Sequence, residues 1–213
     1  MLATDGAHST IRKMFGLKFD GETLSTNIYL CDAEIEGSPQ ECTEALVDGE
    51  NFVIIVPIRE NQVRLMGNSP QYLESIPESK FKILRRNWRS EFVINNRVIE
   101  KMSLGNVYFA GDSAHVHAPL GNRGMNLGIE DVYIFAKLLE QGSVEKYNEV
   151  RHETVKRFVA KVNELCKKAF AYEKTWKKWL LPYIAPLVNQ MIKNDILLFI
   201  TGLDYPLPPF AKL

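Results

Sequence analysis

The chain has 213 residues, with 26 basic and 26 acidic side chains, so its formal net charge is zero. Proteins that bind nucleic acid take much of their affinity from lysine and arginine that neutralise phosphates, and a balanced chain argues against that class. The length allows one large domain or two small ones, each with a core. Three cysteines without short spacing predict neither a disulfide framework nor a zinc site and favour a reducing, cytoplasmic compartment.

The N-terminal residues are typical of the end of a strand followed by a turn. Residues 1–4 continue into the turn signal Asp5-Gly6, and Ser9 or Thr10 can cap a short helix that carries Arg12. The first residues lack a basic-then-apolar leader pattern, and the apolar runs of the chain are too short to span a bilayer, which argues against a membrane protein.

Residues 25–67 predict an antiparallel sheet. Residues 27–35 alternate loosely, residues 44–47 pair with 52–56 across an Asp48-Gly49 turn, and residues 62–66 form a further strand. Pro77 then precedes a predicted helix over residues 78–89, which leads to a strand over residues 91–94.

The stretch from Asn106 to Leu139 carries the strongest signal. An apolar run at residues 107–110 predicts a buried strand that ends at Gly111-Asp112. A loop with Gly121, Gly124 and Gly128 follows, and then a largely buried helix with a polar edge that includes Glu130 and Asp131. A strand that delivers a carboxylate, followed by glycines at a helix start, predicts a site for an anionic or electron-rich group.

The C-terminal third predicts helices. Residues 145–172 form a long amphipathic stripe, and residues 176–210 are apolar pieces interrupted by prolines. The segment 176–181 could lie on a membrane surface, but docking on the body of the protein is the favoured interpretation.

The spacing of residues in the central loop also raises the alternatives of a metal site, a hydrolase site and a simple turn. Asp112, His115 and His117 place a carboxylate and two imidazoles in close order, yet this is weak evidence for a ligand set, and no metal site is predicted. Ser113 lies beside these residues without a G-x-S-x-G elbow, which argues against a hydrolase. The pair Gly121 and Gly124 fits a simple turn almost as well as a cofactor loop.

Two motifs resemble those of FAD-dependent aromatic monooxygenases of the para-hydroxybenzoate hydroxylase type. The first is Gly111-Asp112-Ser113-Ala114-His115-x-His117-x-Pro119 with Gly121-x-x-Gly124-Met125-Asn126-Leu127-Gly128-Ile129-x-Asp131, which resembles the GD motif. The second is Asp5-Gly6-Ala7-His8-Ser9-x-x-Arg12, which resembles the DG motif. Tyr147-x-x-x-Arg151 is similar to the next helix of the family, and residues 201–205 are similar to endings of some members.

The resemblance implies an α/β (α+β) fold in three parts. Residues 1–20 and 98–140 would form a truncated FAD-binding layer, residues 21–97 an antiparallel substrate sheet, and residues 141–213 the C-terminal helices and tail. Asp112 would bond a ribityl hydroxyl of FAD, Pro119 would lie beside the isoalloxazine, and N–H groups near Gly124 would meet the pyrimidine ring. The residues implied in cofactor binding are Asp5, Arg12, Gly111, Asp112, Pro119, Gly121, Gly124, Met125, Asn126 and Leu127, with His8 and Arg12 near the route of NADH or NADPH.

The implied activity is an FAD- and NAD(P)H-dependent monooxygenase that inserts one oxygen atom of O2 into an aromatic or other hydrophobic small molecule; its catalytic residues and substrate are not identified. The G-x-G-x-x-G unit that holds the ADP half of FAD in the family is not found before Asp5. The chain is therefore expected to correspond to the C-terminal half to two-thirds of such an enzyme, to bind FAD poorly alone and to associate with itself or with a chain that supplies the missing half. The alternative is a non-catalytic remnant or binding module of the same fold.

Overall fold

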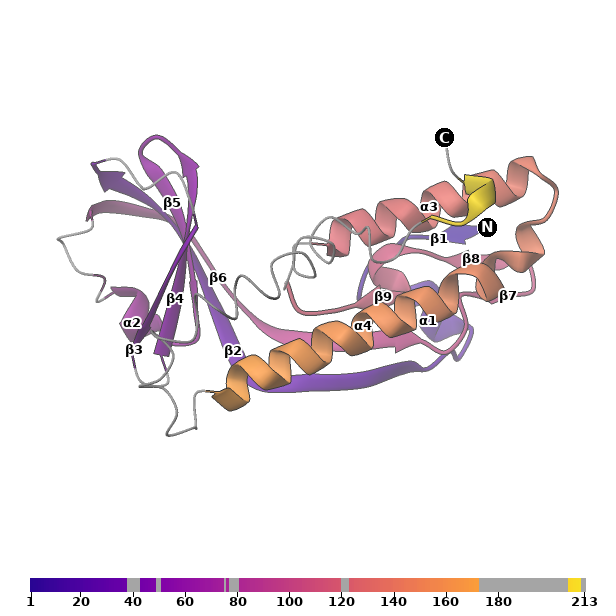
Figure 1. The fold of residues 1–213 in the computed structure, drawn as a ribbon, viewed down its shortest axis with the longest axis horizontal. Coiled ribbons are helices and arrows are strands. Elements are labelled where there is room, and N and C mark those ends of the chain that lie inside the picture. The colour runs from indigo at the N-terminus through magenta and orange to yellow at the C-terminus, as the bar shows by residue number, and fades with distance from the viewer. Residues whose placement is uncertain are drawn as a thin grey trace. The chain divides into compact units, whose positions relative to one another are not determined.

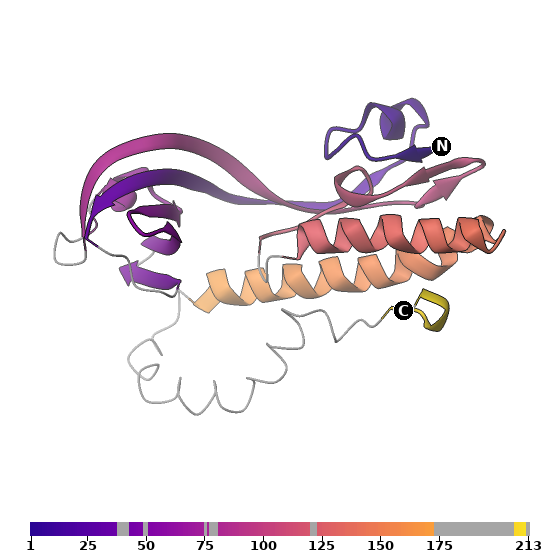
Figure 2. The ribbon, with the colours of Figure 1, turned by 90° about the horizontal axis from the view of Figure 1, so that it is seen from above.

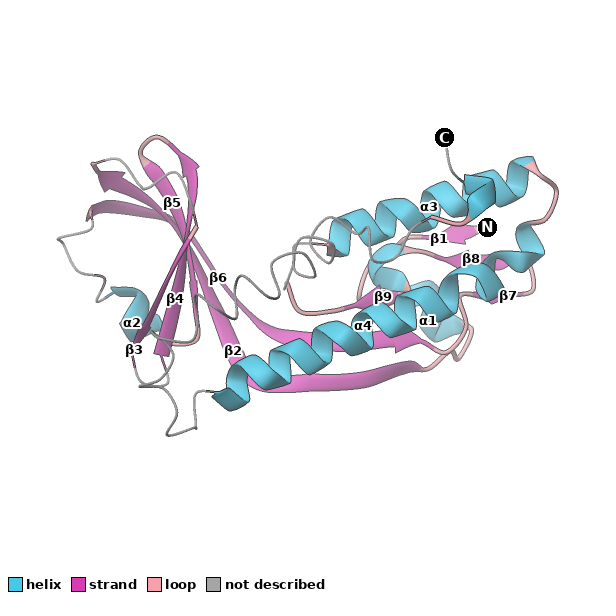
Figure 3. Ribbon diagram, in the orientation of Figure 1, coloured by secondary structure: helices cyan, strands magenta, loops and turns pink. Residues whose placement is uncertain are grey.

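The computed structural model describes residues 1–37, 43–48, 51–74, 76, 81–119, 123–172 and 207–211. The chain divides into two compact units (Figures 1 and 3). The sheet unit comprises Thr23–Ile94, and the motif unit comprises Met1–Glu22 together with Asn95–Leu213. Residues 147–172, assigned from the sequence to a separate C-terminal part, cluster with the motif unit. The α/β class with an antiparallel sheet and C-terminal helices is confirmed.

Strands of the sheet unit follow the predicted alternation. The hairpin of β3 (Glu44–Asp48) and β4 (Asn51–Arg59) is confirmed, with Glu44 opposite Ile55 and Asp48 opposite Asn51. Strand β5 (Gln62–Gly67) pairs with both β4 and β2 (Phe19–Glu36) in antiparallel register. Among the described residues the order in this sheet is β3-β4-β5-β2-β6-β9, where β6 is Lys82–Ile99 and β9 is His115–Val116.

One face of this sheet carries the apolar core of the sheet unit. Short helix α2 (Pro70–Glu74), which the sequence did not predict, covers this face through the buried Leu73. Gly67 permits the contact, because a Cβ there would lie 2.6 Å from Leu73 Cδ1 and 2.3 Å from the Phe52 carbonyl oxygen. The buried core residues are Cys31, Ala33, Ile35, Val53, Ile55, Val63, Leu65, Leu73 and Phe81.

The helix predicted over residues 78–89 is wrong for its described part. Lys82–Ile99 is a single strand, β6, of 18 residues. The arginines and lysines of this segment favour a helix by propensity. Phe81 and Ile83, however, are two residues apart and both pack against the sheet core, which is the period of a strand. Pairing within the sheet overrides local propensity here.

The motif unit is built on two short strands far apart in sequence. Strand β1 (Leu2–Ala3) runs parallel to β8 (Val107–Phe109), and β7 (Ser103–Leu104) pairs with β8 on its other side. Helix α1 (Thr10–Met14) follows β1, while the 3-10 turn η1 (Gly111–Ser113) and β9 (His115–Val116) follow β8. The predicted strand at 107–110 and the short helix that carries Arg12 are confirmed.

Two long helices complete the motif unit. Helix α3 (Gly124–Glu140) and helix α4 (Tyr147–Tyr172) are joined through the 3-10 turn η3 (Val144–Lys146) and lie side by side (Figures 1 and 2). Turn η5 (Pro209–Ala211) contacts α3. No helix in the described part of the chain is long and apolar enough to cross a membrane.

Helix α3 differs from the prediction in two ways. It begins at Gly124, so Gly128 lies inside the helix and not in the preceding loop. It is also less buried than expected on one face, where Met125 is 76%, Ile129 59% and Val132 42% exposed. The predicted pieces at 176–181 and 201–205 lie outside the described residues.

Candidate functional site

The two sequence motifs meet through strands β1 and β8. Leu2 lies opposite Tyr108 and Ala3 opposite Phe109 in the parallel register. The Ala3 carbonyl oxygen accepts from the Ala110 N–H at 3.1 Å and from the Ser113 hydroxyl at 2.9 Å. The turn after β1 and the turn after β8 therefore leave the same edge of this small sheet.

Asp5 caps the first of these turns. Its Oδ1 accepts from the Ser9 hydroxyl at 2.6 Å, and its Oδ2 accepts from the N–H groups of Thr10 at 2.8 Å and Ile11 at 3.2 Å. The bond from Ser9 is the main reason that the pKa of Asp5 is lowered. Ser9 itself caps α1 by accepting from the Arg12 N–H at 2.9 Å. Asp5 thus shapes the turn that leads into α1.

Arg12 joins the two motifs. Its guanidinium donates to the Ser113 carbonyl oxygen at 2.8 Å and to the Ala7 carbonyl oxygen at 2.7 Å, and its central carbon lies 3.8 Å from the centre of the Phe19 ring. The side chain is only 5% exposed. The guanidinium of Arg12 is thus already occupied by contacts within the fold. A contact between Arg12 and a nicotinamide cofactor stays a prediction. His8, the other residue predicted on that route, is exposed.

A close approach of two glycines fixes the turn after β8 against helix α3. Gly111 adopts a φ of 61°, which side chains rarely allow. A Cβ on Gly128 would lie 3.2 Å from the Gly111 Cα. Because neither residue carries a side chain, the first turn of the motif can rest directly on the helix. Glycine at 128 permits the close approach, and glycine at 111 permits the left-handed φ of the turn.

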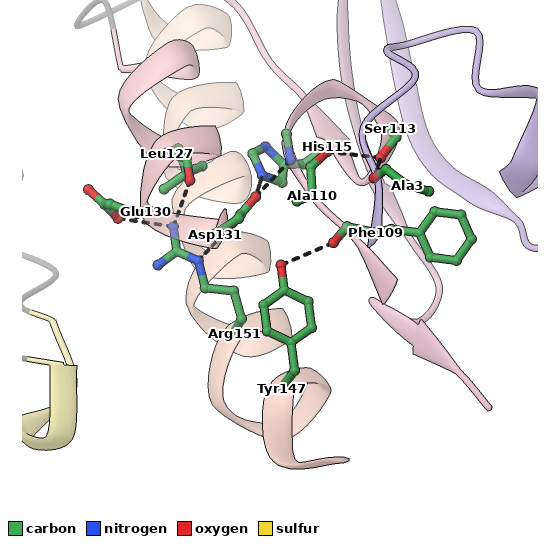
Figure 4. Close-up of polar contacts among 11 residues, drawn as sticks. Ala3, Phe109, Ala110, Ser113, His115, Leu127, Glu130, Asp131, Tyr147 and Arg151 are labelled. Carbon is green, nitrogen blue, oxygen red and sulfur yellow. Dashed lines mark hydrogen bonds and ion pairs between the residues drawn. The ribbon is translucent and has the colours of Figure 1, made fainter. Parts of the chain in front are cut away.

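Asp131 is the buried centre of the motif unit (Figure 4). Its Oδ2 accepts from the Gly111 N–H at 2.9 Å and from His115 Nε2 at 2.6 Å, while its Oδ1 accepts from Arg151 Nε at 2.5 Å. The Asp131 side chain is 0% exposed, so these bonds replace its lost hydration. Burial alone would raise the pKa of Asp131, but His115 and Arg151 outweigh burial and lower it. The carboxylate therefore ties the turn at Gly111, β9 and α4 to α3.

Arg151 extends this network along α3. One terminal nitrogen of its guanidinium donates to the Leu127 carbonyl oxygen at 3.1 Å and to Glu130 at 3.0 Å. Glu130 also pairs with Arg123 at 3.3 Å. Tyr147, one turn before Arg151 on α4, donates its hydroxyl hydrogen to the Phe109 carbonyl oxygen at 3.1 Å, and burial raises its pKa well above the usual value. Arg151 thus bridges the buried Asp131 and the partly exposed Glu130 (Figure 4).

Asp112 is presented to solvent by this framework. It is exposed and makes no hydrogen bond with a described residue, unlike its neighbours Gly111 and Ser113, which are held on both sides. Helix α3 begins nearby at Gly124, and its N-terminal residue Arg123 provides no side-chain cap. The N–H groups of the first turn are therefore open to a ligand, and the helix dipole favours negative charge there.

The other predicted cofactor residues divide into three groups. Met125 and Asn126 are exposed, Gly124 is partly buried at the start of α3, and Pro119 is exposed before it. Leu127 differs, because its N–H donates to the Arg123 carbonyl oxygen at 2.8 Å and its side chain is 1% exposed. Gly121 lies outside the described residues.

The two histidines of the loop have structural partners. His115 Nε2 donates to Asp131, and His117 Nδ1 donates to the Ala118 carbonyl oxygen at 2.7 Å. In the part of the chain that the structure describes, no group of three His, Cys, Asp or Glu side chains converges on a possible metal position. His117 Nε2 is buried without a hydrogen-bond partner, and burial lowers the pKa of this imidazole.

Sequence analysis missed the central role of Asp131. It assigned Glu130 and Asp131 together to the polar edge of the helix, whereas Asp131 is fully buried. The signal that could have found it is Arg151, a second charged residue on a predicted buried face and one helix away. A carboxylate and a guanidinium on facing apolar stripes suggest a buried pair.

Residues 69–162 match the sequence model of a family described as FAD binding domain. The chain is 27% identical over 179 residues to the rifampicin monooxygenase of Streptomyces venezuelae, an alignment that covers 71% of this chain and 38% of that protein. It is 30% identical over 147 residues to an uncharacterized aromatic compound monooxygenase of Bacillus subtilis, covering 61% of this chain and 30% of the relative. The chain thus spans about a third of the length of these curated relatives.

The fold is similar to that of a solved structure, the OxyS anhydrotetracycline hydroxylase from Streptomyces rimosus. The TM-score is 0.73 at 21% identity, with 97% of this chain and 46% of that chain covered. The structural match shows the fold, while the family match and the relatives confirm the predicted resemblance to FAD-dependent aromatic monooxygenases.

Proposed function

We propose that the chain supplies the flavin-ring end of an FAD- and NAD(P)H-dependent monooxygenase that inserts one oxygen atom into an aromatic or other hydrophobic small molecule. One observation carries the proposal: an exposed carboxylate, Asp112, lies on a rigidly held turn close to the uncapped start of α3. The names of the relatives support the class of substrate, since they act on rifampicin or other aromatic compounds.

The residues present fit the flavin end of FAD. Asp112 is free to accept a hydrogen bond from a ribityl hydroxyl, and the first-turn N–H groups of Gly124, Met125 and Asn126 can donate to the carbonyl oxygens of the ring. When bound, FAD supplies the redox chemistry, taking electrons from the nicotinamide cofactor and activating O2. The chain's own contribution is to hold and orient the ring, with positive helix-end potential near the part that gains charge.

The buried network serves this task indirectly. Asp131 fixes the Gly111 N–H, which sets where the next residue, Asp112, leaves the turn. Arg12 fixes Ser113 on the other side. We propose that these residues position Asp112, that the motif unit is the FAD-binding layer and that the sheet unit is the substrate domain. The unpaired buried thiols of Cys31 and Cys166 support a reducing, cytoplasmic setting.

The test is a comparison of flavin fragments on the full chain. Fluorescence titration is expected to give riboflavin nearly the same weak affinity as FAD, with no competition by ADP, because the described contacts all lie at the ring end. Asp112→Ala should weaken riboflavin binding about ten- to a hundredfold, the effect of one charge-assisted hydrogen bond of about 1.5–3 kcal/mol. The exposed Asp20 offers a control, Asp20→Ala, which should change affinity less than about twofold. Competition by ADP, or equal effects of the two variants, would refute this placement.

Association of the isolated chain is a second part of the proposal. Met125, Ile129, Val132 and Leu139 lie on one exposed face of α3 at intervals of three, four and seven residues, and β1 is an edge strand. An exposed apolar helix face and an edge strand each favour contact with another polypeptide. We propose that the chain self-associates through this exposed face of α3.

Light scattering after size-exclusion chromatography tests this association. Ile129→Glu should shift the chain toward monomer, whereas Leu84→Glu, at a 58% exposed position of the sheet unit, should leave the mass unchanged. A monomeric wild-type chain would contradict the association. A chain that binds no flavin in any form would favour the alternative of a non-catalytic binding module.

A further inference from the structure

The sheet unit contains a cavity that the flavin proposal does not use. It has a volume of about 290 Å³ and lies between β2, helix α2 and β6, on the margin of the face that α2 covers. Its apolar walls come from Leu30, Pro70 and Leu73, with the buried Cys31 beside them. The complete lining consists of Tyr29, Leu30, Cys31, Pro70, Leu73, Glu74, Arg86, Arg89, Ser90 and Glu91.

Three of the four charged residues in this lining already have partners. Arg89 pairs with Glu74 at 3.5 Å, and Glu91 accepts a hydrogen bond from the Asn27 amide at 2.8 Å. Arg86 is different: it is partly buried, and it makes no ion pair or hydrogen bond with a described residue. A guanidinium that is partly removed from water and left without a counter-ion is costly, and an anion in the cavity would offset that cost.

Two hydroxyl groups reinforce this polarity. Tyr29 and Ser90 line the same cavity, and neither forms a hydrogen bond with a described residue. The ring of Tyr29 packs partly against the sheet core, and this packing fixes the position of its hydroxyl group. Burial raises the pKa of the Cys31 thiol, and the nearby Arg86 and Arg89 offset this only in part, so Cys31 contributes a neutral wall and no competing anion.

We propose that this cavity binds a small organic anion, a carboxylate attached to a compact apolar or aromatic body. The carboxylate pairs with Arg86 and accepts hydrogen bonds from the hydroxyls of Tyr29 and Ser90. The body lies against Leu30 and Leu73. Apolar walls with a few convergent polar groups are typical of small-molecule sites, and the volume fits the lower end of their range, roughly 300 Å³. The site lies within the sheet unit, so its occupancy does not depend on flavin binding.

Titration of phenylacetate into the full chain without flavin, followed by amide chemical shifts, tests the site. The amides of Cys31, Leu73 and Ser90 should shift in a saturable way. Phenylacetamide, the uncharged match, and inorganic phosphate, which has no apolar body, should each bind at least about tenfold more weakly. No saturable shift at these amides, or phosphate binding as tight as that of phenylacetate, overturns the proposal.

Variants of two neighbouring arginines separate specific from general electrostatics. Arg86→Gln should weaken phenylacetate about ten- to a hundredfold, the effect of losing one charged hydrogen-bond donor. Arg85→Gln is the control, since Arg85 pairs with Glu34 at 3.0 Å, is 70% exposed and does not line the cavity; it should change affinity less than about twofold.

Two results complete the design. If Arg86→Gln does not keep the dispersed amide spectrum of the folded chain, Arg86→Lys replaces it. This variant keeps the charge but loses the planar guanidinium. Its affinity for phenylacetate should lie between the affinities of the wild type for phenylacetate and for phenylacetamide. Equal losses in the Arg85 and Arg86 variants overturn the assignment. Failure of riboflavin to bind, with phenylacetate binding intact and sensitive to Arg86, would count against the flavin proposal and leave this one standing.

Discussion

Both units of the chain bury apolar side chains, but among the described residues only the motif unit also buries polar and charged ones. The motif unit places a carboxylate, Asp131, in full burial and surrounds it with donors from a turn, a strand and a second helix. The sheet unit buries apolar side chains between its strands and α2, and its ion pairs, such as Arg64 with Asp32 at 2.7 Å, lie at least partly in solvent.

The difference follows from what each unit has to hold. Burial of apolar area is strong but non-directional, so it stabilises a sheet without fixing any one atom. Hydrogen bonds to a buried charge are directional, and an unmade one is expensive. The turn at residues 110–115 has few apolar atoms to bury, and only directional bonds can set the position of Asp112 there. The comparison predicts that single polar changes should disable the motif unit, whereas apolar changes should disable the sheet unit.

The largest effect is expected from Asp131→Ala. The change removes the carboxylate that pairs with the buried guanidinium of Arg151 and leaves the Gly111 N–H and His115 without their acceptor. The free energy of unfolding should therefore fall by about 3–5 kcal/mol. Urea denaturation followed by far-UV circular dichroism measures it. The matched control is Asp32→Ala, which removes a partly exposed pair and should cost no more than about 1 kcal/mol. Similar losses in the two variants would remove the contrast between the units.

The second effect concerns the sheet unit. Leu65 is 0% exposed in the apolar core, and Leu65→Ala should lower the free energy of unfolding by roughly 2–5 kcal/mol through lost burial and a residual cavity. Val47→Ala is the control at a 64% exposed strand position, where the expected change is below about 0.5 kcal/mol. Riboflavin binding gives a more specific test. The affinity of folded Leu65→Ala for riboflavin should match that of the wild type, because the substitution lies outside the motif unit.

Elements with a clear local period could be predicted from the sequence. The hairpin at residues 44–56 and the helices at 124–140 and 147–172 each repeat apolar residues at the spacing of their structure. The strand over residues 82–89 could not be predicted from the sequence, because the arginines and lysines of this segment favour a helix and only pairing within the sheet selects a strand. Helix α2 is a single turn, which is too short to carry a period.

The candidate site shows the same division. Asp112 and the start of α3 were found because the motif resembles a family, and Ser9 was found because capping residues have a local signature. The burial of Asp131 and Arg12 was not predicted, since a charged residue indicates exposure unless its partner is known. Their partners, Arg151 and Ser113, are 20 and 101 residues away in sequence. Only the fold brings such pairs together.

A smaller effect is expected at the cap that shapes the first motif. Ser9 accepts from the Arg12 N–H and donates to Asp5, so Ser9→Ala should cost about 0.5–2 kcal/mol of stability. Loss of the Ser9 bond also removes the main influence that lowers the pKa of Asp5, and this carboxyl should titrate at a higher pH in the variant. Carbon-detected NMR titration of the Asp5 side chain measures it, with the exposed neighbour Thr10→Ala as control. An unchanged Asp5 titration would mean that the backbone N–H bonds alone lower its pKa.

The smallest predicted effect is a pH dependence that originates in His117. Burial lowers the pKa of this imidazole below its ordinary 6.5, despite the opposing bond to the Ala118 carbonyl oxygen. The unfolded chain therefore binds more protons than the folded chain just below pH 6.5, and stability rises with pH in that window. The contribution of neutral His117 is complete above about pH 6.5 and is lost as the pH falls through the folded pKa.

His117→Asn isolates this contribution. The Asn amide can take the place of Nδ1 as donor to Ala118, so the variant removes the titration while keeping the hydrogen bond. Just below pH 6.5, the slope of unfolding free energy against pH should be shallower than in the wild type. Because His117 belongs to the motif unit, His117→Asn should reduce the pH dependence of the stability of that unit and leave the sheet unit unchanged. Identical slopes in the wild type and His117→Asn would mean that the imidazole becomes charged in the folded chain without cost.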